Sequence, residues 1–402
     1  MKITYLTKKI LFFLLISSSS TLNAQVTIGS DIPPKEGALL ELKNNIDGSS
    51  TKGLGMPRVA ITSLTDIKLS IPSVQVGEEA QHAGLMVYNV NEDQCAPTPI
   101  FKGLYVWDGS VWQHLGNATS PDVQIYQDQD GNDFKARQFG AAGVWMLENL
   151  YAKNFAPGMG GAPIPLPTGT IVYSTIAYVY PKGTSSNWSA VPPTWDKSQG
   201  LLYTWATAAK GNTSTANQGQ ISGASPGVAE VENIGPLGSV PLKYVQGVCP
   251  DGWHLPSDRE WNELEKEIYN KANIYSTSSS SEFSPTTWVS SWETTPDDRG
   301  SSSTHGHANA MMVQCRLAGS GIGNPAGTSR PAAQGGFSAT LPGGIFASSA
   351  QNYGYYNYLW SSSSAGNSES AWSRDIHVNK ATVARKNSSR NSMYSVRCKK
   401  NQ

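Results

Sequence analysis

The four cysteines carry the most specific chemistry in the sequence: Cys95, Cys249, Cys315 and Cys398. No two of them are spaced as a CxxC pair, so the sequence does not support a zinc knuckle or a thioredoxin-like redox site. They allow three complete disulfide pairings, and buried thiols are the other interpretation. A nucleophilic Cys315 would need a neighbouring base such as His305 or His307, and we do not favour that arrangement.

Two further groups of residues have the side chains that bind metals. Residues 128–133 alternate carboxylates and amides, as in a small Ca²⁺ loop, but the spacing of an EF-hand is incomplete. Since Asp130-Gly131 stands between two strand-like runs, we interpret the hexapeptide as a hairpin turn. His305 and His307 have no identified third ligand and are interpreted as loop histidines. We therefore expect no metal and no cofactor.

The charge balance excludes some classes of partner. The chain has 402 residues, and 30 Lys and Arg balance 30 Asp and Glu. Charged residues make up 15% of the chain, against about 25% in a typical globular protein. A chain without a basic field is not expected to bind nucleic acid.

The first 24 residues have the pattern of a secretory signal peptide. Three lysines precede or flank the start of a seven-residue apolar run at 10–16, and small polar residues lead to Ala24. The run is shorter than the roughly 20 residues that cross a membrane. We expect cleavage after Ala24, which leaves 27 Lys and Arg against 30 Asp and Glu. The sequence thus predicts an exported chain without a transmembrane segment, in a compartment where disulfides form.

The distribution of tryptophan divides the exported chain. Every Trp lies at or beyond Trp107. The strand-like run 84–89 precedes Trp107, the run 103–107 ends with it, and Asp108-Gly109 is a favoured hairpin turn. We expect a β-rich N-terminal module over residues 25–118, a short linker near 117–123, and a second domain over residues 119–402.

One helix is strongly indicated in the second domain, at residues 256–268. Ser257 and Glu260 form a capping box, and Trp261, Leu264 and Ile268 form one apolar stripe. The intervening acids are interpreted as the solvated face of this helix: Glu260, Glu263, Glu265 and Glu267. Residues 308–317 are expected to form a second short helix that carries Cys315 inward.

Several strand-like runs fill the last 70 residues. In the run 371–378, Trp372, Arg374, Ile376 and Val378 alternate and therefore share one face of a strand. Residues 210–240 and 276–304 are polar or serine-rich and are interpreted as loops. Short β segments after two helices predict an α+β domain.

The second domain resembles the Fibrobacter succinogenes major paralogous domain family. The matching words run in order along residues 123–398, and they are Asp130-Gly-Asn, Trp145-Met-Leu-Glu-Asn-Leu, Gly200-Leu-Leu-Tyr-Thr-Trp, Cys249-Pro-Asp-Gly-Trp-His-Leu-Pro-Ser-Asp-Arg-Glu-Trp, Gly336-Phe-Ser-Ala-Thr-Leu-Pro-Gly-Gly, Leu359-Trp-Ser-Ser, Ala371-Trp-Ser-Arg and Ser395-Val-Arg-Cys. The words around Trp253 and Val396 are also similar to C-type-lectin-like folds, and to formylglycine-generating, sulfatase-modifying domains in particular.

These resemblances imply a fold and a disulfide. The fold would be a compact C-type-lectin-like α+β domain with short twisted antiparallel sheets and two helices. Its first helix would be tied to its last strand by a disulfide between Cys249 and Cys398. The words Val26-Thr-Ile-Gly, Gly84-Leu-Met-Val-Tyr-Asn and Gly103-Leu-Tyr-Val-Trp-Asp-Gly resemble β modules of Bacteroidota-type secreted proteins, which implies a stalk or attachment segment.

The lectin-like resemblance and the many aromatic residues predict a non-enzymatic surface protein that binds a glycan or a protein. Aromatic faces suit sugar rings. The candidate contact residues come from the C-terminal strands: Tyr353, Tyr355, Tyr356, Trp360, Trp372 and Arg374. For Trp360 and Trp372 a place in the core is the stronger interpretation. The Ca²⁺-binding Glu-Pro-Asn, Gln-Pro-Asp and Trp-Asn-Asp signatures of lectins are absent from the sequence, so sugar binding through Ca²⁺ is not expected.

Two alternative functions remain open at the level of the sequence. One is a structural or fimbrial-type component of a surface assembly. The other is an enzyme, either of the formylglycine-generating type or a glycan hydrolase. The oxidase would need a reactive cysteine pair, and the hydrolase two converging carboxylates, for which Asp375 and the acids at 128–133 are the candidates. We expect a protein that is not an enzyme, located at the outer surface, outside the cell or in the periplasm.

Overall fold

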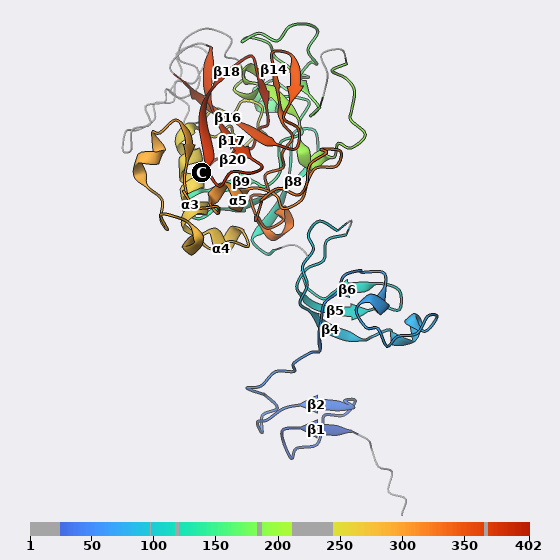
Figure 1. Ribbon diagram of the computed structural model, residues 1–402. Helices are drawn as coiled ribbons and strands as arrows, with labels where there is room; N and C mark the ends of the chain where they lie inside the picture. The colour runs from blue at the N-terminus through green and yellow to red at the C-terminus, as the bar shows by residue number, and fades with distance from the viewer. Residues whose placement is uncertain (1–24, 97, 117–119, 183–186, 211–243, 366–368) are drawn as a thin grey trace, which may run out of the picture.

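The computed structural model describes residues 25–96, 98–116, 120–182, 187–210, 244–365 and 369–402. A small ribbon, a small sheet module and a large domain follow one another along the chain (Figure 1). The predicted signal peptide and most of the loop predicted at 210–240 lie outside the described residues.

The N-terminal region holds two separate sheets. Strands β1 (Val26–Ile28) and β2 (Leu40–Leu42) pair in parallel as a two-stranded ribbon. The second sheet has the order β3-β4-β5-β6, with β3 (Arg58–Val59), β4 (Met86–Asn89), β5 (Gly103–Trp107) and β6 (Trp112–His114). The predicted hairpin at Asp108-Gly109 joins β5 to β6. One face of this sheet packs on a small core that contains Val87, Tyr105, Trp107 and Trp112.

The first sheet of the large domain contains both the first and the last strand of that domain. Its order is β12-β20-β9-β8-β7, with β7 (Val123–Gln127), β8 (Asp133–Gln138), β9 (Val144–Met146), β12 (Trp253–His254) and β20 (Lys399–Lys400). Residues 128–132 turn the chain from β7 to β8, and Asp128 accepts hydrogen bonds from the backbone of Asp130 and Asn132. The predicted hairpin turn is therefore present.

Two more sheets complete the large domain. One has the order β10-β11-β19-β14-β15, with β10 (Tyr178–Val179), β11 (Leu202–Thr204), β14 (Gly344–Phe346), β15 (Ser349–Gln351) and β19 (Met393–Tyr394). The other has the order β13-β18-β17-β16, with β13 (Asp297–Arg299), β16 (Tyr356–Ser364), β17 (Ser370–His377) and β18 (Val383–Ser389). All pairings within these two sheets are antiparallel.

The described helices are few and mostly short. The α-helices are α2 (Trp205–Ala208), α3 (Asp258–Asn270), α4 (Ala272–Tyr275) and α5 (His307–Met311). The 3₁₀ turns are Ile67–Leu69, Glu79–His82, Gly140–Ala142, Pro157–Met159, Lys197–Gln199, Ser280–Glu282, Ser290–Glu293 and Ala332–Gln334. No helix in the described residues is long and apolar enough to cross a membrane. The architecture is sheet-rich and of α+β type, as predicted.

Helix α3 forms where the sequence predicts it. The Ser257 hydroxyl accepts from the Glu260 backbone amide, and the Glu260 carboxylate accepts from the Ser257 amide. Trp261, Leu264 and Ile268 are buried in one core cluster. The second predicted helix is shorter than expected. Helix α5 ends at Met311, because Met312 leaves the helix and pairs with Ala339.

The prediction that the acids of α3 are solvated is wrong for Glu265. Glu265 and Asp258, which share a face of α3, are fully buried among basic side chains. Arg374 Nη1 lies 2.7 Å from Asp258 Oδ1, and Arg385 Nη2 lies 2.6 Å from Asp258 Oδ2. Glu265 accepts from Arg299, Arg374 and His307. Buried charges persist only when they are paired, and here the partners come from distant strands and loops.

Two disulfides connect distant parts of the chain. Cys249 pairs with Cys398, the pair that the family resemblance implies, and so ties the segment before β12 to the last strand. Cys95 pairs with Cys315 and joins the N-terminal module to the large domain. The described chain has no free cysteine.

Candidate functional site

Strand β17 has the predicted alternation, but the face that was expected to bind a ligand is mainly turned into the core, and the other face lines a groove. The face with Arg374, Ile376 and Val378 is turned into the domain, where all three side chains are buried. Arg374 belongs to the ion cluster with α3. The prediction that Arg374 contacts a ligand is wrong, because its side chain is buried and its charge is paired with Asp258 and Glu265.

The two predicted tryptophan contacts also have structural partners. Trp360 is completely buried, stacks on Tyr394 at 4.3 Å between ring centroids, and donates its indole N–H to the Tyr203 carbonyl. Its prediction as a ligand contact is wrong for this reason. Trp372 is half-buried, and the Arg385 guanidinium covers its ring at 3.4 Å from the centroid.

The three predicted tyrosines lie in different environments. Tyr353 is half-buried, its hydroxyl bonds to Gln199 and the Ala318 carbonyl, and Lys182 lies over its ring. Tyr355 is exposed by 44%. Tyr356 begins β16 and lines an open groove on the outward face of the β13-β18-β17-β16 sheet. The structure therefore does not gather the six candidates into one site.

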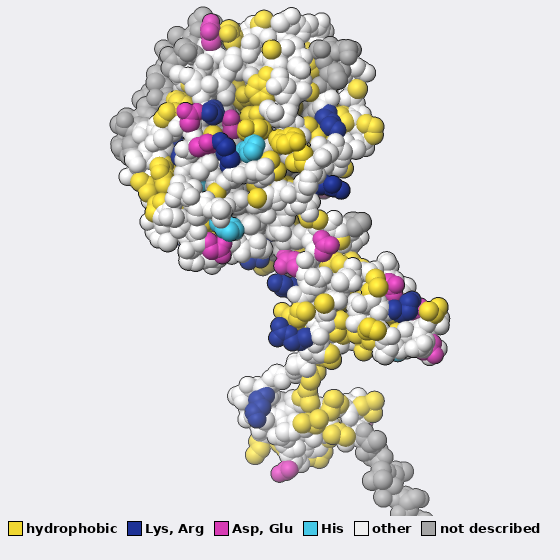
Figure 2. Space-filling view, viewed as in Figure 1, with side chains coloured by type: hydrophobic (Ala, Val, Ile, Leu, Met, Phe, Trp, Pro, Cys, Tyr) yellow, Lys and Arg dark blue, Asp and Glu magenta, His cyan; other side chains and the backbone are white. Residues whose placement is uncertain are grey.

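The groove itself is the candidate site. It has a volume of about 420 Å³. The outward residues of β16, β17 and β18 line it, together with neighbouring loops: Asp298, Phe346, Tyr356, Tyr358, Asp375, His377, Lys380, Ala384, Lys386, Asn387, Ser388, Ser389, Ser392 and Tyr394. On the face shown in Figure 2, hydrophobic side chains in the middle of the large domain are bordered by basic and acidic ones.

Aromatic rings form one side of the groove. Tyr356 and Tyr358 stack with their ring planes 6° apart and their centroids 5.0 Å apart. Tyr358 stacks in turn on Tyr394 and meets Phe346 edge to face. His377 packs edge to face on Tyr356 at 4.5 Å. Tyr358 and Tyr394 are buried and support this wall from behind, so Tyr356 and Phe346 form its partly exposed aromatic surface.

Polar and charged groups form the other side. Burial raises the pKa of Asp375 to about 7, although the Ser373 hydroxyl donates to its carboxylate at 3.1 Å. Burial and the charge of Lys380 lower the pKa of His377. Lys380 pairs with Asp298, and Lys386 pairs with Asp297. At neutral pH the groove therefore holds an acid that changes its protonation state and a histidine that is neutral.

Asp375 and His377 are two of the groove residues that the binding prediction missed. They occupy the other face of the strand on which Trp372 and Arg374 were chosen. The period-2 pattern contained this signal, because Asp375 and His377 alternate with the selected positions. The pattern alone did not tell which face meets solvent.

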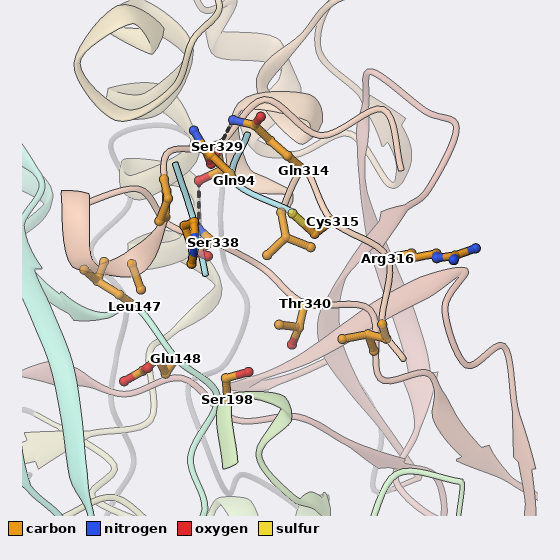
Figure 3. A pocket seen from close by; sticks show the side chains of 15 residues that line it. Gln94, Leu147, Glu148, Ser198, Gln314, Cys315, Arg316, Ser329, Ser338 and Thr340 are labelled. Carbon is orange, nitrogen blue, oxygen red and sulfur yellow. Dashed lines mark hydrogen bonds between the residues drawn. The ribbon is translucent and has the colours of Figure 1, made fainter. Parts of the chain in front are cut away.

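A second cavity lies at the junction with the N-terminal module. It has a volume of about 250 Å³, and Gln94 and Pro99 from the module line it together with residues of the large domain. Figure 3 shows Gln94 near Cys315 and Ser338, with Leu147, Glu148 and Thr340 on the other side. Ser329 accepts from the side chain of Gln314 and from the backbone amide of Ser338. These bonds stay within the large domain.

The remaining metal and nucleophile candidates have structural roles. His307 is buried and bonds to Glu265, and Cys315 is in a disulfide. The prediction of His307 as a loop histidine is wrong, because it begins α5 in the core. In the described part of the chain, no group of three or more His, Cys, Asp or Glu residues is arranged to hold a metal ion.

Two family models match separate stretches of the chain. Residues 27–129 match a phage tail like trimerisation region. No curated protein and no solved structure matches the chain significantly. Residues 141–400, well over half of the chain, match the Fibrobacter succinogenes major domain. Since that match covers two whole sheets, three strands of a third, all four described α-helices and the candidate groove, the chain belongs to the Fibrobacter succinogenes major domain family.

Proposed function

We propose that this protein is an exported, non-enzymatic surface adhesion protein that binds a glycan in the groove on the β13-β18-β17-β16 sheet. The observation that carries the proposal is the combination, in one open groove, of stacked tyrosines with a carboxyl, an imidazole, an amide and hydroxyls. Sugars present apolar ring faces and polar edges, and such a lining matches both.

Several observations support a place outside the cytoplasm. The predicted signal peptide, the two disulfides and the membership of a family of surface-associated proteins all favour export. The C-type-lectin-like classification is part of the proposal. The tie between the last strand and the segment before α3 supports it, because β20 pairs with β12 and Cys398 with Cys249.

A trimeric form is part of the same proposal. The similarity of residues 27–129 to a phage tail like trimerisation region supports three chains joined through the N-terminal region. Three large domains would then present three grooves from one stalk. The same similarity favours a second candidate function, a structural component of a surface assembly whose grooves have no ligand.

A glycan array with the exported chain tests the proposal. We expect binding to a limited set of glycans, and we expect Tyr356→Ala or His377→Ala to lower it at least tenfold. Tyr355→Ala is the matched control, because Tyr355 is exposed on the neighbouring turn but does not line the groove. Absence of binding to every glycan would contradict the proposal and favour the structural function.

The same samples test the non-enzymatic part. We expect bound glycans to be recovered intact after prolonged incubation. Cleavage that is abolished by Asp375→Asn would show instead that Asp375 acts as a catalytic acid, since a carboxyl with a pKa near neutrality is suited to that role.

A further inference from the structure

The sheet of the N-terminal module is apolar on both faces. Its inward residues Val87, Tyr105 and Trp107 form the module's core. Its outward residues are also mainly apolar, and we call them the outer apolar face: Met86, Tyr88, Leu104, Val106 and Leu115. The strand register places Met86 opposite Val106 and Tyr88 opposite Leu104, while the Leu115 amide donates to the Leu104 carbonyl.

These outward side chains are solvent-accessible in the single chain. Met86 is exposed by 38%, Tyr88 and Leu104 by 39% each, and Leu115 by 49%. An antiparallel sheet that keeps one face in water normally alternates apolar and polar residues. A strand sequence that is apolar at consecutive positions is typical of a sheet covered on both sides, and contiguous exposed apolar patches mark contact surfaces.

The parallel ribbon ahead of this sheet has the same property. Val26, Ile28, Leu40 and Leu42 share one of its faces, and all four are exposed. Two-stranded sheets are marginal in water, and parallel strands are normally buried. Hydrophobic side chains are visible over both sheets in Figure 2. Both sheets of the N-terminal region therefore carry exposed apolar side chains on one face.

The charge pattern favours a second copy of the same chain as the partner. On this side of the sheet, β4 and β5 contribute no acidic or basic residue. The edge strands contribute Arg58, opposite Tyr88 with its guanidinium 5.8 Å from the ring centroid, and the uncharged Gln113, opposite Val106. A surface that packs on copies of itself brings like groups together, which is unfavourable for charges and favourable for apolar side chains.

We infer that the outer apolar face is the surface through which three copies of this chain associate, with the apolar face of the β1–β2 ribbon extending the contact. This inference rests on the trimeric form proposed above and assigns its contact residues. Each copy would bury the outward side of β4 and β5 against its neighbours, so that both faces of the sheet become covered.

Light scattering coupled to size-exclusion chromatography tests the inference on the chain without the predicted signal peptide. We expect three chain masses for the parent protein and one for the double variant Tyr88→Ser, Leu104→Ser. Val76→Ser is the control. Val76 is exposed by 85% in the same module but lies outside both sheets, so this variant should stay trimeric.

The outcomes separate the two proposals. A parent protein that is monomeric at tens of micromolar would overturn the trimeric form itself. A double variant that remains trimeric would leave the trimer standing and overturn the outer apolar face as its contact. Loss of the trimer in the Val76→Ser control would also overturn the assignment.

A measurement on the parent protein tests the same inference without substitutions, so it remains valid if the double variant misfolds. Covalent labelling of tyrosine should modify Tyr88 several times more slowly at high protein concentration than after dilution to the monomer. Tyr173, exposed by 38% in the large domain, should label at the same rate in both samples. Equal labelling of Tyr88 at the two concentrations would contradict the inference.

Discussion

At the scale of single residues, the pairing of buried acids distinguishes those that stabilise the fold from the one that lines the candidate groove. Asp258 and Glu265 are buried with arginines on several sides, and Asp375 is not ion-paired within the described structure. Burial alone would raise the pKa of Asp258 and Glu265, but Arg374 and its neighbours outweigh it, and both pKa values are lowered. For Asp375 burial prevails and the pKa rises.

Replacement of Arg374 is expected to destabilise the large domain. Arg374→Ala leaves Asp258 and Glu265 without a central partner, and breaking a buried pair costs about 3–5 kcal/mol. Urea unfolding measures the free energy of unfolding. Lys271→Ala is the control, since Lys271 forms an exposed pair with Glu267 worth about 0.5 kcal/mol or less. A loss for Arg374→Ala as small as that of the control would contradict the structural role.

Asp375 is expected to make stability depend on pH in a definite direction. Its pKa is about 7 in the fold and about 4 in the unfolded chain. Between these values the folded state binds the extra proton, so stability falls as the pH rises from about 4 to about 7 and is then constant. Asp375→Asn removes this loss. Because Asp375 is partly exposed, we expect the variant to gain about 1–2 kcal/mol relative to the parent between pH 4 and pH 8.

Unfolding of both proteins at the two pH values measures this gain. Titrations of other groups cancel in the difference between parent and variant. A difference in the free energy of unfolding that is the same at pH 4 and pH 8 would show that Asp375 has an ordinary pKa.

At the scale of elements, the last strand holds the large domain closed. Strand β20 lies between β9 and β12, and Cys398 beside it is bonded to Cys249, which lies 149 residues earlier in the chain. The second disulfide, between Cys95 and Cys315, joins two parts that each have their own core. The two bonds therefore contribute to different properties of the molecule.

Removal of the two disulfides is expected to have separable effects. Cys249→Ser with Cys398→Ser should lower the unfolding free energy of the large domain by up to about 4–5 kcal/mol, the chain-entropy value for so long a loop. Cys95→Ser with Cys315→Ser should leave that domain's unfolding unchanged and alter the small-angle scattering profile, since the module is released. Equal destabilisation by both pairs would contradict this division.

At the scale of the whole molecule, a trimeric stalk would make adhesion depend on avidity. Three grooves on one assembly bind a dense glycan surface with an effective gain of about 10²-fold or more over a single groove. Tyr88→Ser with Leu104→Ser should keep the affinity for a soluble monovalent glycan and lose this gain. Biosensor measurements at high and low glycan density test it, with Val76→Ser as the control that retains the gain.

The sequence by itself determined the local features and the family. Helix α3 was predictable because its capping box and apolar stripe depend on residues close together in the sequence. The hairpins were predictable because Asp-Gly pairs are local turn signals. The ordered family words identified the large domain. The alternation along β17 was also readable, since a strand has a period of two.

Only the tertiary structure decided which face of β17 meets solvent, which acids of α3 are buried and how the cysteines pair. Each of these depends on partners far away in the chain: Arg374 lies 109 residues from Glu265, and Cys95 lies 220 residues from Cys315. An arginine in a strand has the same local pattern whether it points to solvent or to two buried carboxylates. The packing of the sheet therefore decides where the candidate groove lies, because it turns Asp375 and His377 outward and Arg374 inward.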